Sequence, residues 1–414
     1  MFKELMTFDN AKKLLLAQLN PEPLGTEKIP LIDAYYRILG EDVITTINIP
    51  PFDRSTVDGY AVRADDTYGA EENKPTTLSI IGTINVGEPP NIEIKKNKTV
   101  EIVTGAPIPE GADSVVMVEN TQKQEDSLLI YRAVTRDENI MKKGTDLTKG
   151  EKILKAGQLL GAPEIGVLAA IGMDYVNVLK IPIVSVISTG AEITEPGKEL
   201  GPGKIYDINA YSLSAAVKES GGKSICLGVI PDNEVALETA LKDALVSSDI
   251  IVTSGGVSVG PKDYTPKIVN SLGKPGVIIS GIAVKPGKPT TIAFIGKKPI
   301  FSLPGHPTSA LLIFYLLVRP VIQRLAGTKI VSDKTVKANL TTKLFSAKGR
   351  KTFVTVSLSR DKNQKITALP IQTGASGAIT TLSKADGFIE IPANQQFIDS
   401  NEEVTVTLLT SKKV

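Results

Sequence analysis

The 414-residue sequence contains one cysteine, Cys226, one histidine, His306, and no tryptophan. A single cysteine excludes a disulfide within the chain, and the two counts together exclude a Cys/His zinc cage and an iron–sulfur cluster. A Ser-His-Asp triad would have to use His306. Any bound metal ion would need oxygen ligands, which favours Mg²⁺. Cys226 lies in the apolar run KSICLGVI, which we interpret as a buried core strand.

The sequence also has no excess of one charge and no long apolar run. The formal net charge is +2, so bulk electrostatics favour neither nucleic acid nor an anionic membrane as a partner. The longest apolar run covers 310–318, far short of the ~20 residues of a membrane span. The first twenty residues mix Lys, Glu and Asp with apolar residues, unlike a signal peptide. We therefore expect a cytoplasmic protein.

The pattern of residue types changes along the chain and divides it into four regions. A helix is expected over 7–19, capped by Thr7 and able to pack on the α/β region. Short β-branched runs predict β domains, whereas strands alternating with helices predict a parallel sheet covered on both faces. We thus expect a multidomain α/β plus β fold, with a three-layer α/β domain whose sheet is parallel-rich. The regions are an N-terminal region (1–45 with 141–178), an inserted β-rich domain (46–140), the α/β domain (179–328) and a C-terminal β domain (329–414).

Polar residues and glycines follow each expected strand of the α/β region. The carboxyl ends of strands in an open α/β sheet form its ligand crevice. We therefore expect these residues to share one edge of the sheet. They are Thr189, Gly190 and Glu192 after IPIVSVIS, which ends at Ser188; Asp232 after KSICLGVI; Gly255, Gly256, Ser258 and Asp263 after DIIVTS, which ends at Ser254; Lys285 and Lys288 after GIAV; and Pro304, Gly305, His306, Pro307 and Ser309 after PIFSL. Ser188 and Ser254, as the last residues of their strands, belong to the same expected edge.

This combination of residue types suits a phosphorylated ligand. Glycines let backbone N–H groups approach an anion, and lysines neutralise it. Three carboxylates conflict with a bare phosphate site, but Mg²⁺ bridging carboxylates and phosphate resolves the conflict. Each motif alone also has a structural interpretation: TSGGVSVG as a tight turn, the acidic residues as solvated loops, KPGKP as a turn. Neither a Walker A loop nor G-x-G-x-x-G after the first strand is present.

Two further polar clusters lie outside the α/β region. PFDRSTVDGYAV (51–62) contains Asp58, and VTGAPIPEGADSVVMVE (103–119) contains Thr104. Loops made rigid by Pro and Gly suit a preorganised binding surface. A turn that caps a β domain remains the alternative.

In this order, PFDRSTVDGYAV, VTGAPIPEGADSVVMVE, STGAEI, TSGGVSVGPKDY, VKPGKP and LPGHPTSA resemble the MoeA family of molybdopterin molybdenumtransferases, which includes the C-terminal domain of gephyrin. The resemblance covers nearly the whole chain. It implies an inserted β-rich domain, an elongated dimerisation domain, a molybdopterin-binding α/β domain and a C-terminal β-barrel-like domain. It also implies a homodimer whose active site combines the α/β domain of one subunit with the inserted domain of the other.

The family's reaction cleaves adenylylated molybdopterin in the presence of molybdate or tungstate, places the metal on the dithiolene, and releases AMP. The resemblance implies transient contact with the molybdopterin adenylyltransferase that supplies the substrate. The resemblance further implies that Glu192 and Asp263 are magnesium ligands and that Asp232 is an additional acidic residue of the site. Asp58 and Thr104 would act across the dimer, and Lys285 and Lys288 would bind an anionic group. Further matches are Pro304, Pro307 and Ser309 at the pterin pocket, and Arg350 and Ser376 in the last domain.

The sequence departs from the family pattern at three positions. His306 stands where Asn is common, either as a substitute hydrogen-bond partner or as a group that titrates near neutrality. Gly281 replaces a lysine found in some relatives, and Ala191 replaces a polar residue. Two other functions stay open: a non-catalytic scaffold of the same fold, and a molybdopterin adenylyltransferase. Retention of the acidic residues argues against the scaffold, and the extra β domains argue against the adenylyltransferase.

Overall fold

The structure is a computed structural model that describes residues 5–19, 23–255, 265–328, 334–371 and 383–409. The chain forms two compact units. One contains residues 1–27 and 178–414, and the other contains residues 28–177.

The first unit contains a six-stranded sheet of mixed direction. Its order is β17-β14-β18-β22-β21-β19. The first four strands are parallel, and the last three form antiparallel pairs. The strands are β14 (Ile183–Thr189), β17 (Lys223–Ile230), β18 (Ile250–Ser254), β19 (Pro275–Ser280), β21 (Thr291–Ile295) and β22 (Lys298–Leu303). The parallel-rich sheet expected from the sequence is therefore present.

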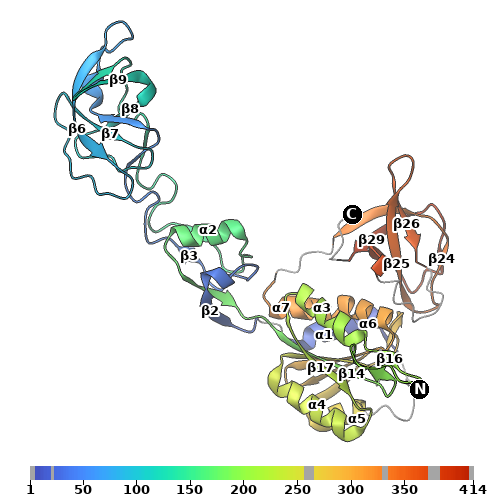
Figure 1. The fold of residues 1–414 in the computed structure, drawn as a ribbon. Coiled ribbons are helices and arrows are strands. Elements are labelled where there is room, and N and C mark those ends of the chain that lie inside the picture. The colour runs from blue at the N-terminus through green and yellow to red at the C-terminus, as the bar shows by residue number, and fades with distance from the viewer. Residues whose placement is uncertain (1–4, 20–22, 256–264, 329–333, 372–382, 410–414) are drawn as a thin grey trace. The chain divides into compact units, whose positions relative to one another are not determined.

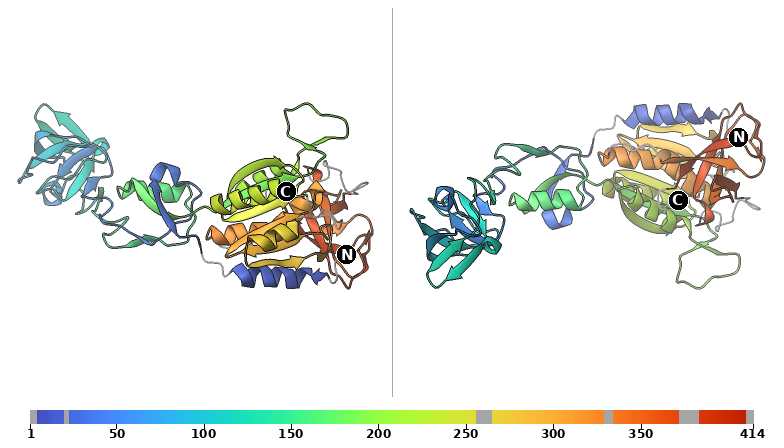
Figure 2. Two further views of the ribbon diagram at one scale, coloured as in Figure 1. Left: turned by 90° about the horizontal axis from the view of Figure 1, so that it is seen from below. Right: turned by 90° about the horizontal axis from the view of Figure 1, so that it is seen from above.

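Helices cover both faces of this sheet (Figures 1 and 2). One face packs on α4 (Glu234–Ser247) and α5 (Thr265–Leu272). The other packs on α1 (Phe8–Leu19), α3 (Asn209–Glu219) and a continuous helix over 307–325. That helix consists of α6 (Pro307–Ile313), a π-helical turn (Phe314–Val318) and α7 (Arg319–Leu325). The bounds of α1 agree with the helix predicted over 7–19 to within one residue.

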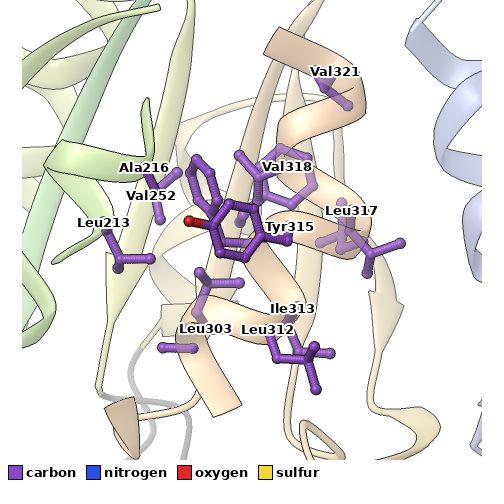
Figure 3. Close-up of a cluster of buried hydrophobic side chains, with 14 of the residues drawn as sticks. Leu213, Ala216, Val252, Leu303, Leu312, Ile313, Tyr315, Leu317, Val318 and Val321 are labelled. Atoms are coloured by element: carbon purple, nitrogen blue, oxygen red, sulfur yellow. The ribbon is translucent and has the colours of Figure 1, made fainter. Parts of the chain in front are cut away.

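The helix over 307–325 forms the centre of the larger core. Leu312, Tyr315 and Val318 point from it toward Leu213 of α3 and Val252 of β18 (Figure 3). By length and composition alone this helix could cross a membrane, but 72% of its most apolar window is buried in the protein. Such burial is that of a core helix.

Helix α1 joins this core as its sequence pattern predicts. The hydroxyl of Thr7 accepts a hydrogen bond from the backbone N–H of Asn10 (3.3 Å), which caps the helix. Phe8, Ala11, Leu15 and Leu19 are buried, at the i, i+3, i+4 spacing of one helix face. The ring of Phe8 also meets that of Phe353 edge to face at 5.3 Å. The first helix thereby contacts the C-terminal domain.

The C-terminal domain is a closed five-stranded barrel. Its strands pair in the order β25-β26-β23-β29-β27, and β27 pairs back with β25. These strands are β23 (Thr335–Leu340), β25 (Lys351–Arg360), β26 (Ile366–Pro370), β27 (Gly387–Ile391) and β29 (Glu403–Leu408). β20 (Ile282–Lys285) and β1 (Met6–Thr7) extend the sheet beyond β25, and β24 (Leu344–Phe345) pairs separately with β28 (Phe397–Ile398). Closure leaves the five barrel strands without a free edge.

The second unit contains a six-stranded β sheet and smaller paired segments. The sheet order is β8-β5-β7-β6-β10-β9. Its strands are β5 (Gly59–Val62), β6 (Thr76–Ile84), β7 (Lys98–Ile102), β8 (Ser114–Met117), β9 (Thr121–Gln124) and β10 (Ser127–Ile130). Further elements are the pairs β2 (Thr26–Pro30) with β13 (Tyr175–Leu179), β3 (Val43–Ile44) with β12 (Lys152–Leu154) and β4 (Arg54–Ser55) with β11 (Ile140–Met141), helix α2 (Ala162–Ala170), and short 3₁₀ helices at Leu31–Asp33, Ala64–Thr67 and Val118–Asn120.

Two expectations about strands were wrong. Cys226 is exposed rather than part of the core, because β17 is the edge strand of its sheet and is only partly covered. GIAV does not end a strand of the α/β sheet, as expected: the run VIISGIAV divides at Gly281, where φ is +81°, into β19 and β20. β20 then joins the barrel sheet instead of the α/β sheet.

Candidate active site

The four parallel strands end together at one edge of the α/β sheet. Thr189 of β14 is in register with Ile230 of β17, and Ser188 with Ser254 of β18. Ser254 in turn is in register with Leu303 of β22. The segments that follow these strands therefore start side by side, in the arrangement that forms a ligand crevice in open α/β sheets.

A cavity of about 600 Å³ opens at this edge. Its volume is in the range of small-molecule sites. The walls combine predicted site residues with apolar side chains. They are Ser188, Thr189, Glu192, Ile193, Leu200, Ile205, Tyr206, Asp207, Ile208, Asn209, Ser254, Gly255, Gly305, His306 and Pro307.

One wall comes from the loop after β14. Within it, β15 (Ile193–Thr194) pairs in parallel with β16 (Ile205–Tyr206). The chain then reaches Asp207, whose Oδ1 accepts hydrogen bonds from the hydroxyl of Ser188 and the N–H of Ala210, both at 3.0 Å. Asp207 thereby joins the end of β14 to the first turn of α3, where a carboxylate is favoured by the helix dipole.

Asn209 links two other walls of the cavity through hydrogen bonds. Its Nδ2 donates to the hydroxyl of Ser254 (2.6 Å) and to the carbonyl of Gly305 (2.8 Å). Since a carbonyl can only accept, this second bond identifies the amide nitrogen. The Oδ1 of Asn209 and the hydroxyl of Thr189 are enclosed but have no hydrogen-bond partner among the described residues. Unpartnered enclosed polar atoms are costly and suit a site that a ligand completes.

Gly255 gives the turn after β18 its shape. Its φ is +90°, and a Cβ there would lie 2.1 Å from the carbonyl oxygen of Thr189. Only glycine fits this close approach between the turns after β14 and β18.

The second unit contains a separate pair of predicted site residues. Asp58 Oδ1 accepts from the backbone N–H of Thr104 (2.7 Å) and from its hydroxyl (2.8 Å). These bonds hold the pKa of Asp58 below its usual value, the backbone N–H having the larger effect. Both residues are exposed. The arrangement presents an ionised carboxylate at the surface.

Comparison with known proteins identifies the family. Three family profiles match: the MoeA N-terminal region (domain I and II) over 6–172, a probable molybdopterin binding domain over 185–324, and the MoeA C-terminal region (domain IV) over 337–409. The chain belongs to the MoeA family.

Relatives match over nearly their full length. A molybdopterin molybdenumtransferase of Haemophilus influenzae is 35% identical over 97% of this chain and 98% of its own. The protein of the same name from Bacillus subtilis is 34% identical over 93% and 90%. A solved molybdopterin biosynthesis MoeA protein from Pyrococcus horikoshii is 40% identical, covers 98% of this chain and 99% of its own, and has a TM-score of 0.84. A second structure from that organism has a TM-score of 0.74.

Several predicted MoeA site residues lie beside the cavity without lining it. Gly190 follows β14, and Asp232 is exposed between β17 and α4. Pro304 and Ser309 are buried on either side of the turn that contributes Gly305, and the Pro304 carbonyl accepts from Ser254 at 3.5 Å. These residues share the carboxyl-end edge that the sequence predicts.

Other predicted residues are elsewhere or undescribed. Lys285 is the last residue of β20 in the barrel sheet and Lys288 follows that strand, so the expectation that both follow a strand of the α/β sheet was wrong. Arg350 lies in the turn before β25. Gly256, Ser258, Asp263 and Ser376 lie outside the described residues.

The acidic residues can be compared with the needs of Mg²⁺. Over the described ranges, no group of three His, Cys, Asp or Glu side chains is close enough to hold a metal ion. Mg²⁺, however, is commonly held by one or two carboxylates plus substrate phosphates. Glu192 lines the cavity as an oxygen donor of that kind.

Sequence reasoning missed Asp207 and Asn209. A signal was present, because Asp and Asn directly before a helical stretch are typical N-terminal capping residues. Their position within the cavity could not be predicted from the sequence, because it depends on how the loop after β14 folds back.

Proposed function

We propose that this chain is a molybdopterin molybdenumtransferase. It binds adenylylated molybdopterin and molybdate or tungstate, cleaves the phosphoanhydride, and releases AMP with the metal on the dithiolene. The main support is full-length similarity to proteins of that name together with a cavity made by the family's own motifs.

In this proposal Glu192 and Asp263 hold Mg²⁺, and Asp232 adds negative charge nearby. When bound, the ion offsets charge that develops on the phosphate oxygens. The backbone at Gly255 and Gly305 permits close approach of the substrate, because neither residue has a side chain. Pro304 and Pro307 make the turn around Gly305 rigid. No protein nucleophile is required, in keeping with a chain that has one histidine.

Residues from outside the cavity complete the proposed site. Lys285, Lys288 and Arg350 bind anionic groups, and Ser376 adds a hydroxyl. The carboxylate of Asp58, oriented by Thr104, acts in the partner subunit's site.

The proposed active form is a cytoplasmic homodimer that receives its substrate from a molybdopterin adenylyltransferase. Exposed apolar side chains in the second unit, including Ile32, Tyr35 and Tyr36, offer contact surface for a second copy. Neither nucleic acid nor a membrane is required.

The test is to incubate the protein with adenylylated molybdopterin, Mg²⁺ and either oxyanion, and to measure AMP and finished cofactor. We expect equimolar AMP and cofactor, and loss of both with a chelator. Consumption of ATP with free molybdopterin would instead identify an adenylyltransferase. Binding without turnover would identify a scaffold. Comparing the two oxyanions determines the natural substrate.

A further inference from the structure

The carboxylate of Asp207 is buried in the cavity wall without a cation. The residue is 5% exposed, and no ion pair joins it to any residue in the described part of the chain. A buried carboxylate is costly unless hydrogen bonds or a positive group compensate it. Its environment therefore leaves part of this compensation to another molecule.

The two oxygens of Asp207 differ. Oδ1 accepts from Ser188 and Ala210, which fixes the orientation of the carboxyl group. Oδ2 accepts no hydrogen bond from the described residues, and it is not one of the enclosed atoms that lack a partner. Because Asp207 lines the cavity, its remaining exposure is toward that space. Oδ2 is thus an oriented acceptor that is available to a molecule in the cavity.

A second acceptor lies two residues further on. Both N–H groups of Asn209 are used by Ser254 and Gly305, and its Oδ1 has no partner among the described residues although the side chain is 8% exposed. Around these acceptors the walls are apolar, with Ile193, Ile205 and Pro307. The cavity therefore combines apolar side chains with acceptors that have no partner among the described residues, which suits a heteroaromatic ring rich in N–H donors.

We propose that Asp207 is the specificity-determining residue that recognises the 2-amino-4-oxo edge of the pterin ring. This edge presents two N–H donors, from the 2-amino group and N3. Because Oδ1 of Asp207 already accepts two hydrogen bonds, Oδ2 accepts the one from the 2-amino group. The assignment rests on the proposed function, since that function supplies a pterin substrate. It makes Asp207 a binding residue with no part in the cleavage step.

The test uses two rings that differ at this edge. Pterin carries the 2-amino group, whereas lumazine has a carbonyl there, which would oppose the carboxylate. Ligand-detected NMR titration measures the affinity of each ring without Mg²⁺, oxyanion or turnover. We expect the wild-type protein to bind pterin about ten- to a hundredfold more tightly, the effect of losing a charged hydrogen bond. Equal affinity of the wild-type protein for the two rings would overturn the assignment.

The matched variants are Asp207→Asn and Asp243→Asn. In Asp207→Asn, the N–H of Ala210 still needs an acceptor, so the amide oxygen stays at Oδ1 and an NH₂ replaces Oδ2. We expect a folded protein that has lost its preference for pterin. Asp243, exposed on α4, gives the same change of charge far from the cavity wall and should leave the preference intact.

Four further outcomes are informative. A retained preference in Asp207→Asn would refute the proposal, as would a loss of Mg²⁺ affinity with the ring preference unchanged. If Asp207→Asn does not fold, the wild-type comparison of the two rings still decides. A protein that discriminates the rings but inserts no molybdate would refute the proposed function and leave this assignment standing.

Discussion

Asp58 shows how a local contact sets the state of a single residue. Its carboxylate is exposed, yet two hydrogen bonds from Thr104, 46 positions away, favour the ionised form and lower its pKa. Because the folded pKa is lowered, the stabilisation is present above the unfolded pKa and is lost as pH falls through the folded pKa. The residue therefore stays ionised at a lower pH than an ordinary aspartate.

Thr104→Val removes the hydroxyl but keeps the backbone N–H. We expect the pKa of Asp58 to rise part of the way toward its ordinary value, measured by NMR titration of ¹³C-labelled aspartates and assigned with Asp58→Asn. Thr104→Ser retains the hydroxyl and should keep the lowered pKa. An unchanged pKa in Thr104→Val would show that the hydroxyl does not act on Asp58.

Glu192→Gln tests the proposed magnesium ligand. It keeps the shape of the side chain and removes its charge. We expect the Mg²⁺ concentration for half-maximal activity to rise about tenfold or more, since each ~1.4 kcal/mol of lost interaction is a factor of ten. Glu195→Gln is the control: Glu195 pairs with Lys198 in the same loop and does not line the cavity. An unchanged Mg²⁺ requirement in Glu192→Gln would contradict the role.

At the scale of elements, the turns after β14 and β18 depend on each other. Gly255 at φ +90° lets the backbone of one turn reach the carbonyl of Thr189 in the other. This contact brings Ser254 within reach of Asn209 and so helps to assemble the cavity. The position requires glycine for two separate reasons, conformation and space.

Gly255→Ala and Gly197→Ala separate these reasons. Gly197 has φ +89° but open space around its Cβ position, so alanine there meets only the conformational cost of about 1 kcal/mol. We expect Gly255→Ala to lose at least about 2 kcal/mol more, because its Cβ meets backbone. Urea unfolding monitored by circular dichroism measures both. Equal losses of stability in the two variants would mean that the turns after β14 and β18 move apart easily.

At the scale of the whole molecule, the predicted site residues are divided between the two compact units. The cavity residues belong to the first unit, whereas Asp58 and Thr104 belong to the second. In the proposed dimer, each active site takes residues from two subunits.

Mixed dimers test this arrangement. At a Mg²⁺ concentration well below the raised requirement of Glu192→Gln, Asp58→Asn and Glu192→Gln should each be nearly inactive alone. Co-expressed, they form a heterodimer with one intact site, so random pairing should restore about one quarter of wild-type activity. Mixtures of either variant with itself serve as controls. No recovery in purified, differently tagged heterodimers would place both residues in one subunit's site.

Local patterns in the sequence determined much of this protein. The spacing of apolar residues predicted α1, and the strand–helix alternation predicted the edge that gathers Thr189, Ser254 and Gly305. Both follow from short-range properties, namely propensity, capping and periodicity. The ordered motifs likewise indicated the family before any contact was known.

Tertiary structure decided what depends on partners distant in the chain. β20 leaves the α/β sheet for the barrel, Cys226 is exposed on an edge strand, and β25 closes the barrel with β27. Asp207 and Asn209 enter the cavity because the loop after β14 folds back onto the strand ends. Sheet membership and cavity walls are long-range pairings, and they are settled by which surfaces meet when the chain is compact.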